Sequence, residues 1–225
     1  MQILEYFLQR PATELDQSEI NAFEKLFADY VLPARGKEIP YDLALPKWQF
    51  LCYLCDQKHL LLHGSNSPDI AEFEPRKAND IEEFGNRLAV YASSDGIWPM
   101  YFAIVNRDKV TLLVNACFKT VFEDATSGNS YYYFSVDEAA LASYAWQEGT
   151  VYIIRRETFE QQPEQERWGM RFSIAQWASP VAVKPLAKLA VTPEDFPFLS
   201  QTRGHDPVEL SRRAAANPAG FPWHE

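Results

Sequence analysis

The chain carries seven short apolar runs of strand length, and few long helical patterns separate them. Several of these runs are rich in Val, Ile, Tyr and Phe, which are enriched in β-strands. A doubly wound parallel sheet needs a helix between successive strands, so the scarcity of helical patterns argues against that fold. We therefore predict an α+β fold of two packed, largely antiparallel small sheets. The predicted strands lie at residues 59–63, 87–92, 110–117, 130–136, 150–155, 170–177 and 181–184.

Helical patterns are found toward the two ends of the chain. Asp16 or Ser18 can cap a helix whose apolar residues recur at helical spacing and which ends at Pro33. A second helix is expected to begin at Pro46. These patterns divide one globular unit into an N-terminal helical annex at residues 1–57, an α+β core at 58–199 and a C-terminal tail at 200–225. The tail contains a short helix at 208–216.

Size and charge restrict the classes of protein that fit the sequence. The chain has 225 residues, of which 47% are hydrophobic and 14% aromatic, and this is enough for one well-packed core. The formal net charge of -10 opposes a protein whose main task is to grip nucleic acid, because phosphate binding needs a basic surface. No apolar run approaches the roughly 18 to 20 residues of a membrane helix, so we expect no membrane contact.

The cysteines and histidines indicate packing rather than metal chemistry. Cys52 and Cys55 have Cys-x-x-Cys spacing, but no second pair follows at zinc-site spacing, and both fall in a pattern that predicts a buried helix. His59 and His63 would lie about 13 Å apart in one strand, too far for a single metal ion. We therefore predict core packing for the cysteines and no metal site. The absence of a signal-peptide pattern and the three cysteines favour a cytoplasmic protein.

One apolar run ends in His63, Gly64 and Ser65 in place of ordinary turn residues. A strand would hold the imidazole rigidly, the glycine would let a ligand approach the backbone, and the serine would add a hydroxyl. A second apolar run contains Tyr91, and Tyr101 follows ten residues later. Side chains of these types at strand ends predict the edge of a binding site.

This arrangement resembles the His-Tyr-Glu class of ADP-ribosyltransferases, whose poly(ADP-ribose) polymerase-like members carry a strand tyrosine followed by a helix tyrosine. The resemblance covers residues 58–105 and a later strand. It implies NAD as the substrate, with His63 bound to the adenosine-side ribose and the Gly64 backbone holding the nicotinamide amide. In the same way it implies that Tyr91 or Tyr101 stacks on the nicotinamide ring.

The third element of that family, a glutamate on a late strand, is replaced here. The best-aligned position is Gln176. An amide can accept a hydrogen bond from a ribose hydroxyl, but it brings no negative charge to an oxocarbenium-like transition state. Loss of one such electrostatic contact typically costs about 100- to 1000-fold in rate, so binding could survive where turnover does not. Glu164 and Glu166 lie upstream in a polar run, and we expect neither to substitute.

Arg76 follows the histidine run and could meet a pyrophosphate as a bidentate donor, although a surface salt bridge to a neighbouring glutamate is an equal alternative. We expect an ADP-ribosyltransferase-like protein that binds NAD in a cleft between the sheets and transfers ADP-ribose to an unknown acceptor, which could be a protein. The catalytic candidates are His63, Tyr91 and Gln176. A non-catalytic module that binds a nucleotide or a partner is the alternative. A third reading is an interaction scaffold in which the His-Gly-Ser run is only a turn.

Overall fold

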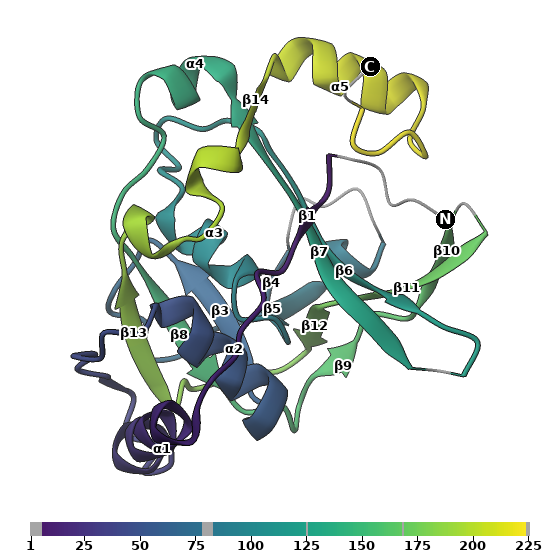
Figure 1. Cartoon of the computed structure of the whole chain (residues 1–225). Coiled ribbons are helices and arrows are strands. Elements are labelled where there is room, and N and C mark those ends of the chain that lie inside the picture. Colours follow the sequence, from purple (N-terminus) through teal and green to yellow (C-terminus); the bar gives the residue numbers. More distant parts are fainter. Residues whose placement is uncertain (1–5, 78–82, 125, 168, 224–225) are drawn as a thin grey trace.

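The computed structural model describes residues 6–77, 83–124, 126–167 and 169–223. Two sheets and a small number of helices form an α+β fold, which confirms the predicted fold class (Figure 1). The smaller sheet consists of β1 (Leu8–Gln9), β6 (Leu113–Val121), β7 (Ser127–Asp137), β10 (Gln165–Arg167), β11 (Met170–Ile174) and β14 (Arg203–His205). Its order is β1-β7-β6-β11-β10, with β14 paired to β7.

The larger sheet has the order β2-β13-β8-β3-β5-β12-β9, and β4 pairs with β5. The pairs of β2 with β13 and of β14 with β7 are parallel, while the other described pairs are antiparallel. The strands of this sheet are β2 (Lys37–Glu38), β3 (Leu61–Ser65), β4 (Arg76–Lys77), β5 (Leu88–Ser93), β8 (Gly149–Ile154), β9 (Glu160–Gln161), β12 (Gln176–Ser179) and β13 (Ala187–Val191).

The predicted strand at 170–177 is wrong in one respect, because it is two strands in different sheets. Ala175 separates β11 from β12; its amide donates to Cys117 O at 3.2 Å, and its carbonyl accepts from Ser94 N at 3.0 Å. Apolar and polar residues are mixed throughout residues 170–177, so the composition of this segment does not reveal the crossing. The predicted strand at 181–184 is also wrong, since only Val183 forms an isolated bridge, and β13 was missed.

The helices follow local capping signals. Asp16 caps α1 (Gln17–Leu26) in a capping box with Glu19, and a π-helical turn at Phe27–Val31 continues this helix. Pro46 precedes α2 (Lys47–Lys58), whose end is marked by His59 in the left-handed conformation, so His59 is not in a strand as predicted. The remaining helices are α3 (Trp98–Ile104), α4 (Glu138–Ala142), α5 (Pro207–Ala216) and three 3₁₀ turns at Phe84–Asn86, Pro193–Asp195 and Leu199–Gln201.

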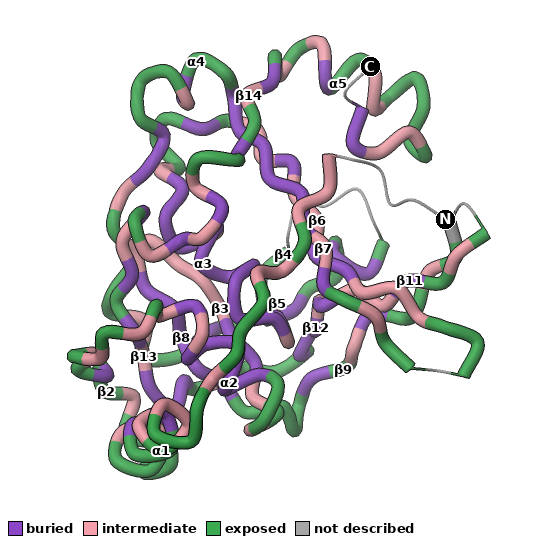
Figure 2. The backbone as a smooth tube through the Cα atoms, in the orientation of Figure 1, coloured by how far each residue is buried: buried purple, intermediate pink, exposed green. Residues whose placement is uncertain are grey.

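The main core lies between the two sheets and around α2 and α3 (Figure 2). Tyr101 on α3 and Phe134 on β7 lie there, with ring centroids 4.7 Å apart. Cys52 and Cys55 are buried on α2 in the same core, which confirms the packing prediction. Among the described residues, no group of side chains could hold a metal ion, and no helix is long and apolar enough to cross a membrane.

The N-terminal segment adds strands to both sheets, and the C-terminal segment adds one strand to the smaller sheet. Strand β1 pairs with β7 and β2 pairs with β13, so residues before α2 add an edge strand to each sheet. Strand β14 pairs with β7 and leads into α5, which lies at the opposite end of the molecule from α1 (Figure 1). The predicted annex and tail are therefore joined to the sheets by backbone hydrogen bonds.

Candidate functional site

A cavity of about 840 Å³ lies where the two sheets meet. Strands β3, β5 and β12 of the larger sheet contribute to its wall, as do β6 and β11 of the smaller sheet. The start of α3 and the C-terminal segment from α5 onward complete it. A volume of this size is in the ordinary range of small-molecule sites, roughly 300 to 1,000 Å³.

Aromatic side chains line much of this cavity. Phe118 on β6 packs against Phe172 on β11, with centroids 5.1 Å apart, and against Phe7 at 4.9 Å. On the α3 side, Trp98 and Phe102 lie with centroids 5.8 Å apart. Several aromatic rings from separate elements can therefore contact a flat ligand.

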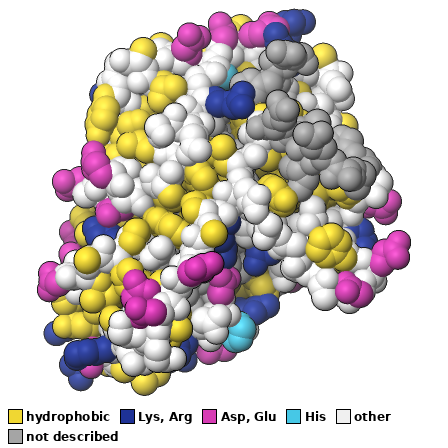
Figure 3. All heavy atoms as spheres, in the orientation of Figure 1, with side chains coloured by type: hydrophobic (Ala, Val, Ile, Leu, Met, Phe, Trp, Pro, Cys, Tyr) yellow, Lys and Arg dark blue, Asp and Glu magenta, His cyan; other side chains and the backbone are white. Residues whose placement is uncertain are grey.

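The cavity wall contains an arginine but no described acidic residue, although the chain as a whole is acidic. The net charge is -10, and on the face seen in Figure 3 the acidic side chains are spread out rather than gathered in one patch. No Asp or Glu is among the described residues of the wall, whereas Arg107 is. Its guanidinium carbon lies 5.9 Å from the centroid of the Phe102 ring, and no described carboxylate forms an ion pair with it. The cavity therefore offers a cation, and its wall supplies no described anion.

His63 lies at a point where β3 and β5 separate. The two strands pair only at Leu62 and Ser93 in the described register. Beyond that pair, Nδ1 of His63 lies 2.7 Å from the carbonyl oxygen of Tyr91, so Nδ1 carries the proton and donates it. The imidazole centroid is 4.5 Å from that of Phe73. The imidazole thus replaces a backbone donor between the strands, and Nε2 is left as the acceptor.

Burial lowers the pKa of His63, and the bond to the Tyr91 carbonyl only partly opposes this effect. Above the ordinary value of 6.5 both the folded and the unfolded forms are neutral. Below it the unfolded chain binds a proton that the folded form resists, so stability falls until the folded pKa is reached.

We expect the His63→Asn variant to lose less stability than the wild type between pH 7 and pH 5. Asparagine can still donate to the Tyr91 carbonyl but does not titrate. Each unit by which the folded pKa lies below the unfolded one contributes about 1.4 kcal/mol to the difference. Urea denaturation of both proteins at the two pH values measures it. Equal pH dependence would show that the histidine is not held neutral.

Of the predicted site residues, the structure brings His63, Gly64, Tyr91 and Gln176 to the cavity. The Tyr91 hydroxyl lies within hydrogen-bond distance of two backbone carbonyls of its own loop, Phe84 O at 3.0 Å and Arg87 O at 2.9 Å. These bonds hold the phenol toward its own loop. Gln176 is the first residue after the crossing at Ala175. The bonds of Ala175 to the two sheets therefore fix where Gln176 lies.

Three other predicted residues are not among those that line the cavity. Tyr101 is fully buried, and its hydroxyl donates to Ser135 O at 2.8 Å, so its ring belongs to the main core. Arg76 is exposed on β4, away from the wall. The hydroxyl of Ser65 accepts from Ser67 N at 3.1 Å within its own turn. The sequence pattern therefore overestimated how many side chains of this segment converge.

Gly64 has a packing role as well as a place in the wall. A Cβ on Gly64 would lie 1.8 Å from the carbonyl oxygen of Pro99 on α3. A Cβ on Gly149 of β8 would likewise lie 1.9 Å from the carbonyl oxygen of Ala103. Helix α3 therefore rests on the sheet through two glycines, and this contact places Trp98 and Phe102 in the wall.

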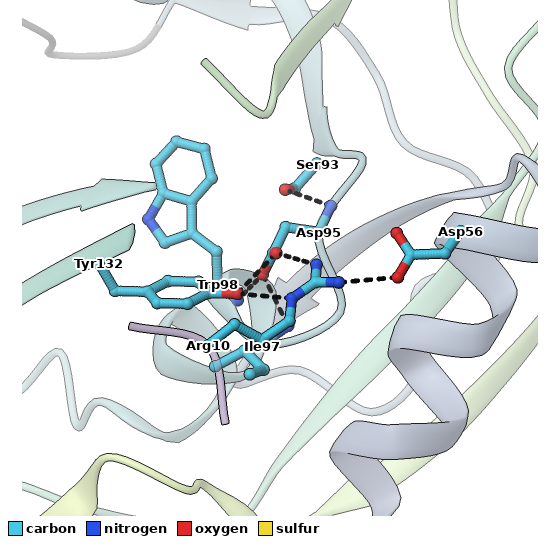
Figure 4. Close-up of polar contacts among 7 residues, drawn as sticks. All are labelled: Arg10, Asp56, Ser93, Asp95, Ile97, Trp98 and Tyr132. Atoms are coloured by element: carbon cyan, nitrogen blue, oxygen red, sulfur yellow. Dashed lines mark hydrogen bonds and ion pairs between the residues drawn. The ribbon is translucent and has the colours of Figure 1, made fainter. Parts of the chain in front are cut away.

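A buried ion pair that the sequence analysis missed holds the wall together (Figure 4). Asp95 is fully buried; one of its oxygens accepts from Arg10 Nη2 at 2.5 Å and from the Tyr132 hydroxyl at 2.7 Å. Its other oxygen accepts from the backbone N–H groups of Ile97 and Trp98, each at 2.9 Å. The sequence does hold a signal for this ion pair. Asp95 stands in a polar run just before the first turn of the aromatic helix, where an acidic residue can cap the helix.

Burial alone would raise the pKa of Asp95, but the charge of Arg10 and the hydrogen bonds outweigh it, so the pKa is lowered. The carboxylate is therefore ionised, and its charge is fully used inside the network. It organises the start of α3, and its bonding partners Ser93 and Trp98 line the cavity although Asp95 itself does not.

The resemblance to ADP-ribosyltransferases stays an expectation drawn from a few residues. The cavity itself is defined by aromatic rings, amides and one guanidinium. In comparisons with protein-family models, with curated proteins and with solved structures, nothing matched this chain.

Proposed function

We propose that the cavity binds a dinucleotide of the NAD type and that the protein acts as a binder rather than as a transferase. The observation that carries this proposal is the composition of one wall: aromatic rings, side-chain amides and Arg107, without a described carboxylate. A dinucleotide combines two flat rings with an anionic pyrophosphate, and these groups match that composition. An aromatic surface binds the rings, and a guanidinium binds the phosphate oxygens.

The same wall argues for binding without turnover. Cleavage of the nicotinamide glycosidic bond develops positive charge on the ribose, and a nearby carboxylate usually stabilises it. Gln176 stands at the position where the resemblance implies that carboxylate, and the nearby Glu164 instead lies 3.5 Å from Arg171, outside the wall. His63 uses Nδ1 for a structural bond, and its remaining nitrogen brings no negative charge.

Calorimetric titration of NAD into the wild type and the Arg107→Gln variant tests the proposal. We expect binding by the wild type and a loss of about tenfold or more in the variant, because hydrogen bonds to charged groups contribute about 1.5 to 3 kcal/mol. Adenosine, which lacks the phosphates, should show no such difference. Arg155→Gln is the matched control, since Arg155 is an exposed arginine outside the wall. An absence of heat with NAD would reject the proposal.

Nicotinamide release from NAD then separates a binder from an enzyme. We expect no nicotinamide release from the wild type. We expect release from the Gln176→Glu variant if the new carboxylate places a negative charge beside the ribose. Release by the wild type would support the transferase instead.

One observation favours a partner peptide as the second candidate. In the described register, β11 pairs with β6 only from Phe118 to Val121. The preceding part of β6 lines the cavity, so its edge could accept an added strand. This candidate gains support if NAD produces no heat.

A further inference from the structure

Asn115 is a half-buried residue of the cavity wall, on β6. Its Oδ1 accepts a hydrogen bond from Trp98 Nε1 on α3 at 2.8 Å. An indole N–H can only donate, so this bond decides which end of the amide is the oxygen. Nδ2 must then occupy the other end, and its two hydrogens are the donors that the side chain can offer to a bound molecule.

The Nδ2 group of Asn115 is open to a ligand. It forms no hydrogen bond with any described residue, and it is not one of the unpaired polar atoms that packing seals from water. The indole that orients the amide is only 8% exposed and belongs to the main core, so it cannot turn aside. Asn115 therefore presents a donor to the cavity in a fixed orientation.

A row of contacts joins this donor to Arg107. The ring of Trp98, which is bonded to Asn115, has its centroid 5.8 Å from that of Phe102. The guanidinium carbon of Arg107 lies 5.9 Å from the same Phe102 centroid. All four residues line the cavity. This part of the wall thus follows a cation with two aromatic rings and then with a neutral donor.

The charge of Arg107 decides which ring of a dinucleotide fits this row. The oxidised nicotinamide ring is positively charged, and the guanidinium would repel a cation placed against Phe102. Adenine is neutral at pH 7, and its flat face can stack on aromatic rings and on a guanidinium plane. The ring nitrogens of adenine are acceptors, so its edge is complementary to Asn115 Nδ2.

We propose that this row is the adenine subsite of the cavity, in which Asn115 Nδ2 donates to a ring nitrogen of the base and Trp98 positions the amide for that bond. This inference rests on the proposed function, because it assigns one end of the dinucleotide to one part of the same cavity. The anionic pyrophosphate then lies at the Arg107 end of the row, and the nicotinamide ring lies outside it.

Calorimetric titration of the two halves of NAD, adenosine monophosphate and nicotinamide mononucleotide, into the wild type and the Asn115→Asp variant tests this assignment. The new carboxylate can still accept from Trp98 Nε1, but it sets a lone pair against the ring nitrogen of adenine. We expect adenosine monophosphate to bind the variant at least about tenfold more weakly than the wild type, since a site built for one partner rejects a mismatched one.

Nicotinamide mononucleotide reports the effect of the added charge alone. Each half carries one phosphate, so the new charge acts on both through screened solvent, and we expect its affinity to change by no more than about threefold. Asn21→Asp is the matched control, because Asn21 is exposed on α1 outside the wall. It should leave both affinities unchanged. If Asn115→Asp does not fold, Asn115→Ala removes the amide without adding a charge and allows the same comparison.

The Trp98→Phe variant tests the positioning role. Phenylalanine keeps an aromatic ring but has no N–H, so the amide of Asn115 is free to turn. We expect Asn115→Asp to weaken the binding of adenosine monophosphate by a smaller factor in the Trp98→Phe background than in the wild type, because the two residues act together. The same factor in both backgrounds would show that the indole does not position Asn115.

The subsite and the proposed function fail in different ways. The subsite is overturned if adenosine monophosphate does not bind the wild type, or if Asn115→Asp affects nicotinamide mononucleotide as much as or more than it affects adenosine monophosphate. Binding of NAD by the wild type keeps the proposed function in either case. If NAD produces no heat but adenosine monophosphate binds and depends on Asn115, the dinucleotide function is rejected and the adenine subsite is retained.

Discussion

The Asp95→Ala variant is expected to lose about 3 to 5 kcal/mol of unfolding free energy, as when one partner of a buried ion pair is removed. Arg10, whose side chain is 17% exposed, would keep its charge without its buried counter-ion. The Tyr132 hydroxyl and the backbone N–H groups of Ile97 and Trp98 would lose an acceptor as well. Urea denaturation at pH 7 measures the loss.

The control for this experiment is Asp56→Ala. Asp56 also binds Arg10, at 2.7 Å, but its side chain is 36% exposed. Solvent screens such a pair, so we expect a loss of no more than about 1 kcal/mol. If both variants lost the same amount, the stability of the region would depend on neutralising Arg10 and not on the buried acceptor.

The second large effect is expected for Gly64→Ala and for Gly149→Ala. In each case the new methyl group would overlap a backbone carbonyl of α3, at 1.8 Å and 1.9 Å respectively. A backbone atom cannot turn aside as a side chain does, so the helix must move from the sheet. We expect each variant to lose about 3 kcal/mol or more, at the upper end of what overpacking costs. Denaturation with urea measures both losses.

The double variant distinguishes this mechanism from two unrelated strains. A single displacement of α3 relieves both overlaps. The double variant should therefore lose less unfolding free energy than the sum of the losses in the two single variants. Gly169→Asn is the control, because Gly169 has φ +70° and open space around its Cβ position, and asparagine tolerates that conformation. Additive losses in the double variant would contradict a shared movement of the helix. Since Trp98 moves with α3, its fluorescence should also change in the glycine variants.

The architecture could be inferred from the sequence because it depends on local patterns. A run of β-branched and aromatic residues indicates strands such as β8, and Asp16 indicates the start of α1. The crossing at Ala175 could not be inferred in this way. Residues 170–177 have a strand-like composition on both sides of the crossing, so they look like one continuous strand.

The candidate site was only partly predictable for a related reason. His63, Gly64 and Tyr91 were identified from apolar runs of strand length and Gln176 from the family resemblance, and all four line one cavity. Arg107 and the residues of the smaller sheet come from segments far away in the sequence, and only tertiary packing brings them to the same wall. Tyr101 lies in the core and not in the cavity because a helix buried between two sheets has apolar residues on all sides, so aromatic spacing cannot tell core from cavity.

The single-residue crossing at Ala175 also limits how the protein can exchange a bound molecule. The peptide groups on either side of this residue are hydrogen-bonded to β6 and to the segment after β5, so the sheets are fastened together at that end of the cavity. Entry and exit by parting of the sheets there would break both bonds. We therefore expect a bound molecule to enter and leave through a part of the wall away from Ala175.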